Sequence, residues 1–306
     1  MHRDQPHRAG PTYQGRPLAR PDQDIEDQGL GFDLGTLMRR RQIFRMLGIG
    51  AAGLGLAACG SNGTGTAASS LGSSGSTGST GSTAEIPDET AGPYPGDGSN
   101  GPDVLQQSGI VRGDIRSSFG TATGTAHGVP MTLELTVQNL ADGGTPFTGA
   151  AVYVWHCDRE GRYSLYSDGV TAENYLRGVQ IADADGKVRF PSIFPACYAG
   201  RWPHVHFEVY PDRAGITDAT KVIATSQVAL PKNVGETVYA QAGYEQSVAN
   251  LARVSLDTDN VFGDDGGARQ LGTVTGDVAS GYTVSLAVPV DTRTSAPGGS
   301  GGGPGR

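Results

Sequence analysis

Short runs of alternating apolar and polar residues recur through this chain, and they constrain its fold more than any other feature. Residues 131–138 place three aliphatic side chains on one side of an extended chain, which is the period of a half-buried strand. Further runs rich in Val, Tyr, Phe and Ile lie at residues 150–155, 187–194, 204–210, 222–230 and 282–290. Turn residues separate the runs, and only residues 237–253 leave room for helical turns. The pattern predicts an all-β domain, an antiparallel β-sandwich or barrel with few short helices.

Low-complexity sequence borders this domain on both sides. Residues 59–84 are mostly Gly, Ser, Thr and Ala, and residues 293–306 form a second stretch rich in Gly, Pro and Ser. Such segments bury too little apolar surface to offset the entropy of ordering, so we expect a flexible tether and a disordered tail. The folded domain is therefore expected at residues 85–292, and its length is sufficient for a sizeable core.

Residues 1–58 have the features of a targeting segment. Arg39-Arg-Arg-Gln-Ile-Phe-Arg45 precedes an apolar run of 13 residues, whereas a membrane-spanning helix needs about 20. The paired arginines resemble a twin-arginine export signal, and Leu56-Ala-Ala-Cys59 resembles a bacterial lipobox. We expect lipidation of Cys59 and anchoring of the domain at the outer face of the bacterial cytoplasmic membrane. A plain secretory signal is the alternative, and a start at Met38 would leave residues 1–37 untranslated.

The charge of the chain excludes one class of partner. Residues 1–58 hold eight arginines and six acidic residues, so the remainder has 15 basic and 25 acidic residues and a net charge near −10. Nucleic-acid binding needs a basic surface. We therefore expect no nucleic-acid partner.

Two histidines and two tyrosines are candidate metal ligands. His204 and His206 lie two apart in a predicted strand, so both imidazoles share one face. Taken alone, the pair also fits ordinary hydrogen-bonded histidines, and Glu208 on the same face would allow a ferrous site with two histidines and a carboxylate. Tyr163 and Tyr198, in turn-rich segments, add two phenols. Phenolate ligands favour a hard trivalent ion, most plausibly non-haem Fe(III), because zinc and ferrous sites use His, Cys and carboxylates.

Residues 88–265 resemble the intradiol ring-cleavage dioxygenases, the group of protocatechuate 3,4-dioxygenase and catechol 1,2-dioxygenase. The matching motifs, in order, are Glu89-Thr-Ala-Gly-Pro-Tyr94, Gly149-Ala-Ala-Val-Tyr-Val-Trp155, Gly161-Arg-Tyr163, Leu176-Arg-Gly178, Asp185-Gly186 with Phe190, and the arginine–histidine motif from Arg201 to His206. The resemblance implies a β-sandwich that holds non-haem Fe(III) through Tyr163, Tyr198, His204 and His206.

The resemblance also implies an activity and further site residues. The expected reaction is cleavage of a catechol-type ring between its hydroxyls with O2, to a cis,cis-muconate-type product. Tyr198 would be the ligand that is released, and Arg201 would stabilise negative charge on the ring. Gln227, Tyr94 and Pro93 match residues that line the substrate pocket of the family. A non-catalytic binding or carrier lipoprotein with the same fold is the alternative, and the particular catechol and the oligomeric state stay open.

The charges of such a site agree with this interpretation. Tyrosine has a pKa near 10, so it is a phenolate at neutral pH only beside a strong cation. Two phenolates and a hydroxide cancel the charge of Fe(III), which can then act as a Lewis acid on a chelating catechol.

Cys157 and Cys197 each neighbour a proposed ligand segment. A disulfide between them would suit an exported domain, and two buried thiols are the alternative.

Overall fold

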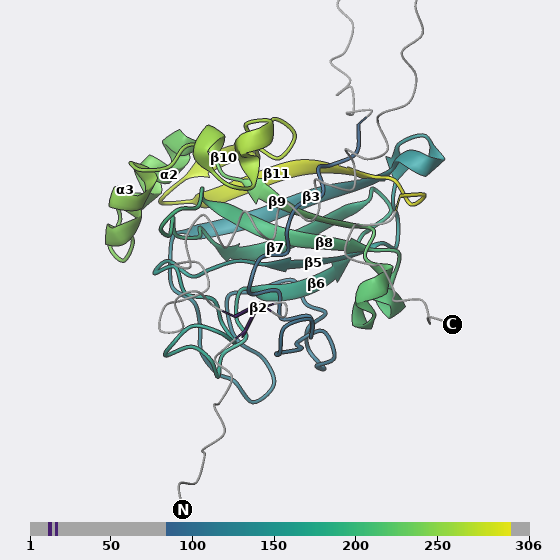
Figure 1. The fold of residues 1–306 in the computed structure, drawn as a ribbon, viewed down its shortest axis with the longest axis horizontal. Helices are drawn as coiled ribbons and strands as arrows, with labels where there is room; N and C mark the ends of the chain where they lie inside the picture. The colour runs from purple at the N-terminus through teal and green to yellow at the C-terminus, as the bar shows by residue number, and fades with distance from the viewer. Residues whose placement is uncertain (1–11, 14–15, 18–83, 295–306) are drawn as a thin grey trace, which may run out of the picture. The chain divides into compact units, whose positions relative to one another are not determined.

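The computed structural model describes residues 12–13, 16–17 and 84–294. Residues 84–294 form two β-sheets, and two short α-helices, α2 (Lys232–Tyr239) and α3 (Glu245–Leu251), lie together at one end of them (Figure 1). The chain divides into two compact units, residues 1–27 with 81–306 and residues 28–80, of which the second lies outside the described residues. The predicted targeting segment and nearly all of the predicted tether and tail also lie outside them. Two short strands, β1 (Thr12–Tyr13) and β2 (Arg16–Pro17), pair with each other.

One sheet has five strands and the other has four. The five-stranded sheet runs in the order β10–β11–β3–β4, and β7 also pairs with β3; its strands are β10 (Thr273–Asp277), β11 (Gly281–Val290), β3 (Pro130–Asn139), β4 (Thr145–Pro146) and β7 (Lys187–Ile193). The four-stranded sheet runs in the order β6–β5–β8–β9; its strands are β6 (Arg177–Ile181), β5 (Ala151–Trp155), β8 (His204–Tyr210) and β9 (Ala224–Ala229). The predicted β-sandwich is confirmed.

The pairing differs from the prediction in one respect. β3 and β11 are parallel, over nine residue pairs from Tyr282↔Met131 to Val290↔Asn139, whereas the other strand pairs in residues 84–294 are antiparallel. Nearly the whole domain separates these two strands along the chain, so no hairpin fixes their relative direction. A parallel pair is therefore possible here without a local crossover.

The period of two residues explains the faces of β8. Val205, Phe207 and Val209 point into the main core cluster, which also contains Leu133 and Val284 from the other sheet. The alternate residues of β8 lie on the opposite face of the four-stranded sheet, and all seven residues of the strand are buried. β5 behaves in the same way and is buried throughout. The two central strands therefore carry a second buried face outside the sandwich core.

The segment that precedes β3 covers this second face. Val104, Leu105 and Ile110 pack there with Tyr153 and Trp155 of β5 in a separate apolar cluster. The backbone of the segment is tied to the sheets, because Arg112 N donates to Val179 O at 2.9 Å and Ile115 N donates to Pro191 O at 3.0 Å. Polar side chains on the outer face of β5 and β8 are thus enclosed rather than exposed to solvent.

Short 3-10 turns make up the remaining regular structure. They are η2 (Leu140–Asp142), η3 (Arg213–Thr217), η4 (Ala219–Lys221), η5 (Leu256–Thr258) and η6 (Phe262–Asp264). No helix among the described residues is long and apolar enough to cross a membrane.

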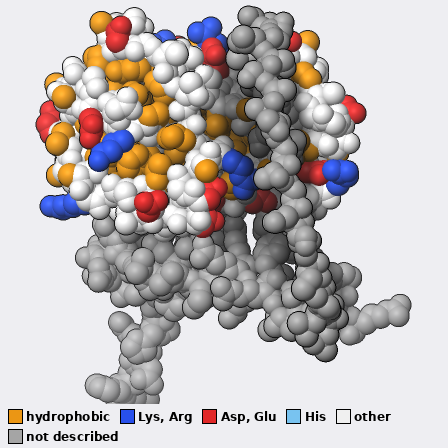
Figure 2. All heavy atoms as spheres, turned by 90° about the horizontal axis from the view of Figure 1, so that it is seen from above, with side chains coloured by type: hydrophobic (Ala, Val, Ile, Leu, Met, Phe, Trp, Pro, Cys, Tyr) orange, Lys and Arg blue, Asp and Glu red, His pale blue; other side chains and the backbone are white. Residues whose placement is uncertain are grey.

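Apolar side chains also gather on one outer face of the domain. Figure 2 shows them across the face seen from above, with charged side chains scattered around them. Half-buried apolar residues extend the main core toward the surface, among them Val254, Leu256, Val274, Val278 and Leu286. These side chains are the outer layer of the core, because they pack against it.

Candidate metal centre

β8 brings two imidazoles together on its outer face. His204 and His206 are each 2% exposed, and their Nε2 atoms lie 3.0 Å apart. The ring of His206 stacks on Trp155 of the neighbouring strand β5, with centroids 4.9 Å apart and planes inclined by 6°. His206 and Trp155 are cross-strand partners, so the strand register creates this stack.

Both imidazoles are neutral and can offer lone pairs. Burial, followed by the nearby Arg201 cation, lowers the pKa of His204 to about 3. Burial and the neighbouring His204 lower the pKa of His206 well below its ordinary value. His204 Nδ1 lies 2.5 Å from the carbonyl oxygen of Trp202 and must donate to it, so His204 Nε2 presents a lone pair to the site.

Two phenol oxygens lie beside these nitrogens. Tyr198 Oη is 3.2 Å from His204 Nε2, and Tyr163 Oη is 3.5 Å from the same nitrogen. The two phenol oxygens are 3.4 Å apart. The structure therefore brings together Tyr163, Tyr198, His204 and His206, the four ligands that the sequence predicted.

Local backbone contacts hold the two tyrosine segments against each other. Asp158 Oδ1 accepts from the backbone N–H groups of Glu160 and Arg162 and so closes the turn before Tyr163. The carbonyl of Asp158 accepts from Ala196 N at 3.1 Å, two residues before Tyr198. Gly161 has a φ of 86°, and a Cβ at this position would lie 3.3 Å from Tyr198 Cβ, so glycine permits both the turn and the close approach.

The four donor atoms fit a hard trivalent cation such as Fe(III). Phenol oxygens and imidazole nitrogens converge at one point, and two neutral imidazole nitrogens 3.0 Å apart would gain from a cation that both can bind. The described residues contain no cluster of three or more His, Cys, Asp or Glu side chains that could hold a metal by themselves.

Glu208, the alternative carboxylate ligand, is engaged elsewhere. Its Oε2 accepts a hydrogen bond from Tyr210 at 2.8 Å. Burial, with the Asp97 carboxylate nearby, raises the pKa of Glu208 to about 8, so the carboxyl stays largely protonated at neutral pH. A protonated carboxyl is a poor metal ligand, and the site with two histidines and a carboxylate is not favoured.

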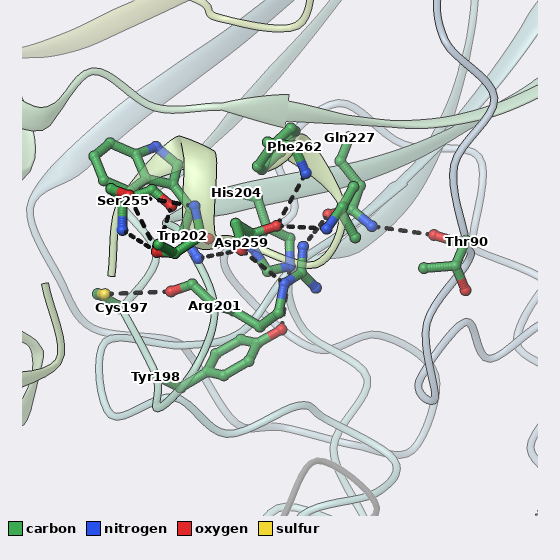
Figure 3. A network of polar contacts seen from close by, with 12 residues as sticks. Thr90, Cys197, Tyr198, Arg201, Trp202, His204, Gln227, Ser255, Asp259 and Phe262 are labelled. Carbon is green, nitrogen blue, oxygen red and sulfur yellow. Dashed lines mark hydrogen bonds and ion pairs between the residues drawn. The ribbon is translucent and has the colours of Figure 1, made fainter. Parts of the chain in front are cut away.

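An arginine network borders the site on the side of Tyr198. Arg201 Nε donates to Asp259 Oδ2 at 3.0 Å, and Arg201 Nη2 donates to Gln227 Oε1 at 2.7 Å. Gln227 Nε2 in turn donates to the carbonyl of Thr90 at 3.1 Å. Figure 3 shows the Tyr198 hydroxyl pointing toward the Arg201 guanidinium and His204.

The segment of Pro93 and Tyr94 covers the site beside Tyr163 and His206. The ring of Tyr94 packs against Tyr163, with centroids 4.8 Å apart. A Cβ on Gly92 would lie 3.2 Å from His206 Cε1, so the backbone here runs directly over that imidazole. Pro93 is half-buried, and its backbone carbonyl accepts a hydrogen bond from the Asn100 side chain.

The disulfide considered for Cys157 and Cys197 is not present, and both residues are buried thiols. Cys157 Sγ donates to Ala196 O at 3.7 Å, and Cys197 Sγ donates to Arg201 O at 3.4 Å. The two thiols have different carbonyl partners although their segments adjoin. Sequence proximity to the ligands could not show this, because the direction of a side chain decides whether a bridge can form.

Known dioxygenases match parts of the chain. A sequence model described as Dioxygenase matches residues 100–213. Chlorocatechol 1,2-dioxygenase from Rhodococcus opacus is 42% identical over 55 residues, which are 18% of this chain and 21% of that protein. Chlorocatechol 1,2-dioxygenase from Pseudomonas sp. (strain P51) is 30% identical over 130 residues, 37% of this chain and 49% of that protein. The matched region thus spans half or less of these relatives.

The fold agrees with these matches. The structure of an intradiol ring-cleavage dioxygenase from Tetranychus urticae aligns with 70% of this chain and 98% of its own, at 20% identity and a TM-score of 0.56. Part of the chain is thus similar in sequence to catechol-cleaving dioxygenases, and the domain shares the fold of an intradiol ring-cleavage dioxygenase.

One residue beside the four donor atoms was not predicted. Asp259 lies between η5 and η6, 58 residues after Arg201, and its side chain is fully enclosed. No local motif in the sequence marks it, because an aspartate before a turn is common. Only the fold brings it to Arg201.

Proposed function

We propose that this chain is a non-haem Fe(III)-dependent intradiol dioxygenase. It would cleave a catechol-type ring between the two hydroxyls with O2 and give a cis,cis-muconate-type product. The observation that carries the proposal is the meeting of four donor atoms from Tyr163, Tyr198, His204 and His206, with recorded separations of 3.0 to 3.5 Å. The chemistry that a ferric ion supplies in such a site is Lewis-acid binding of both catechol oxygens.

The two tyrosines differ in freedom to move, which suggests different roles. Tyr163 is 1% exposed and is packed against Tyr94, so its phenol is held in place. Tyr198 is half-buried, and its ring can turn with less rearrangement. Tyr198 Oη, as the phenolate that a bound cation would stabilise, would therefore accept a proton from a catechol hydroxyl as the substrate binds, which is a general-base role.

Arg201 and Gln227 support negative charge on the substrate. The guanidinium of Arg201 lies beside the Tyr198 hydroxyl, and Gln227 holds it through Nη2 (Figure 3). Fixed donors of this kind stabilise charge that develops during a reaction, because they need no reorganisation. Tyr94, Gly92 and Pro93 form the covering segment that would exclude water from one side.

Purification of the protein with its metal tests the proposal. We expect stoichiometric iron and a wine-red colour from tyrosinate-to-iron charge transfer, strongly weakened in Tyr163→Phe and Tyr198→Phe. Tyr210→Phe is the matched control, because this buried tyrosine of β8 donates to Glu208 and not to the four-atom cluster. A colourless protein, or a red protein that consumes no O2 with any catechol, would contradict the proposal and favour the non-catalytic carrier.

We also propose that the protein is exported and held at the outer face of the bacterial cytoplasmic membrane by lipid on Cys59. The support is the sequence alone: the paired arginines, the short apolar run and Leu56-Ala-Ala-Cys59. Cells that express the native chain should hold it in the membrane fraction and incorporate labelled fatty acid into it. Cys59→Ala should abolish the label. Native protein without label, recovered in the soluble fraction, would rule the anchor out.

A further inference from the structure

The Asp259 carboxylate joins two parts of the domain that are distant in sequence. Its side chain is 0% exposed, and both of its oxygens accept two hydrogen bonds. Oδ2 accepts from Arg201 Nε at 3.0 Å and from Trp202 N at 2.6 Å. Oδ1 accepts from Val261 N at 2.8 Å and from Phe262 N at 3.1 Å, which fixes the turn before η6. The carboxylate is fully satisfied and cannot rotate without losing these partners.

This contact decides how the Arg201 guanidinium is oriented. The group is planar, so holding two of its nitrogens sets the direction of the third. Asp259 holds Nε, and Gln227 holds Nη2, itself anchored on the Thr90 carbonyl. No described residue accepts a hydrogen bond from Nη1, although the side chain is only 12% exposed. Two neighbours thus fix the plane and leave one edge of the guanidinium available.

The charges reinforce the geometry. Burial would raise the pKa of Asp259, but the Arg201 cation and the Trp202 N–H outweigh it and hold that pKa below its ordinary value. Burial opposes the charge of Arg201, but Asp259, followed by Tyr198 and Tyr163, more than offsets it, so the pKa of Arg201 lies above its ordinary range. The pair is therefore ionised at all physiological pH values. The guanidinium also lies beside the Tyr198 hydroxyl (Figure 3).

We propose that Asp259 is the positioning residue of Arg201: it sets the plane of the guanidinium so that Nη1 faces the substrate ring. The role in turnover rests on the proposed dioxygenase function. The orientation of Arg201 by Asp259 does not, and it can be tested on the metal-free protein.

A double-mutant cycle tests the role in turnover. Asp259→Asn should lower kcat at least about tenfold with little change in KM, because it disturbs a group that acts on charge developing in the reaction. In an Arg201→Ala background the same change should lower kcat no further. The tyrosinate absorption band of Asp259→Asn should also shift, because the guanidinium beside Tyr198 then changes its orientation. Equal losses in the two backgrounds, or full activity of Asp259→Asn, would overturn the proposal.

NMR of the metal-free protein separates this inference from the activity. In the native chain the Arg201 Nε–H signal should be slow to exchange and should move only when acid protonates Asp259. Asp259→Asn should shift that signal, whereas Asp183→Asn should not, since the Asp183 carboxylate accepts from Asp185 N and Lys187 N, far along the chain from Arg201. Fast exchange of Arg201 Nε–H in the native protein would refute the positioning role, whether or not any variant folds. Slow exchange in a protein without dioxygenase activity would uphold the orientation and reject the proposed function.

Discussion

Arg177 connects the covering segment to the segment of Tyr163 from inside the protein. It is 1% exposed and donates to the carbonyl of Pro95 and to the hydroxyl of Tyr153 through Nη1. Its Nε and Nη2 donate to the hydroxyl and the carbonyl of Ser164, the residue after Tyr163. Gly96 makes room for the guanidinium, because a Cβ there would lie 2.9 Å from Nη1. One side chain thus fixes the positions of Tyr94 and Tyr163 relative to each other.

We expect Arg177→Lys to destabilise the domain by about 2–4 kcal/mol. A single ammonium cannot reach all four acceptors, so buried oxygens lose their partners in a site built for a planar fork. Urea unfolding of the metal-free protein measures the change. Arg189→Lys is the control. This arginine makes an exposed ion pair with Glu134 at 3.2 Å, so the substitution should lower the free energy of unfolding by less than about 0.5 kcal/mol. Equal decreases in the free energy of unfolding for the two variants would show that the Arg177 contacts do not determine stability.

Tyr244, at the beginning of α3, attaches this helix to the residue before β3 and the residue after β7. Its hydroxyl donates to Phe194 O at 2.7 Å and accepts from Val129 N at 3.0 Å. Tyr244→Phe should cost about 1–3 kcal/mol, because a buried backbone N–H loses its acceptor. Tyr282→Phe is the comparison, since no described residue hydrogen-bonds the hydroxyl of Tyr282. Thermal unfolding of both variants measures the difference, and similar Tm values would count against this attachment.

Alternation and runs of apolar residues predicted most of the longer strands, and they missed the strands that show neither pattern. The predicted strand at residues 204–210 has the same bounds as β8, and that at 131–138 lies within β3. β6 begins with the buried Arg177 and a glycine, and β10 is short and mostly exposed, so neither shows an apolar period. The placement of His204 and His206 on one face of β8 could be predicted, because side chains two residues apart in a strand point to the same side. The role of Asp259 could not, because its contact with Arg201 depends on how the η5–η6 connection packs.

At the scale of the whole molecule, Glu89 makes stability depend on pH. This half-buried carboxyl lies in the segment that leads to the covering residues, and its backbone N–H donates to Thr225 O at 2.7 Å. Burial, with Asp264 and Asp265 nearby, raises the pKa of Glu89 from 4.5 to about 8. The folded state therefore binds a proton that the unfolded chain releases, and stability falls as pH rises from about 4.5 to about 8.

Glu89→Gln should remove this penalty. We expect Glu89→Gln to leave the free energy of unfolding unchanged near pH 4 and to raise it by about 1–2 kcal/mol at pH 8. A fully buried carboxyl would give a larger increase, but the Glu89 carboxyl is partly solvated. Urea unfolding of the metal-free protein at the two pH values measures it. Glu236→Gln, on the exposed side of α2, should have the same small effect at both. A gain from Glu89→Gln that does not grow with pH would contradict the assignment.

The central claim is that the cluster of Tyr163, Tyr198, His204 and His206 supports intradiol cleavage. Reaction of the iron-loaded protein with a panel of catechols under 18O2, followed by mass analysis of the products, tests it most directly. The account predicts an acyclic dicarboxylic product, opened between the two hydroxyls, that carries both labelled oxygen atoms. A product with one labelled atom or none, or a ring opened outside the hydroxyl pair, would contradict it.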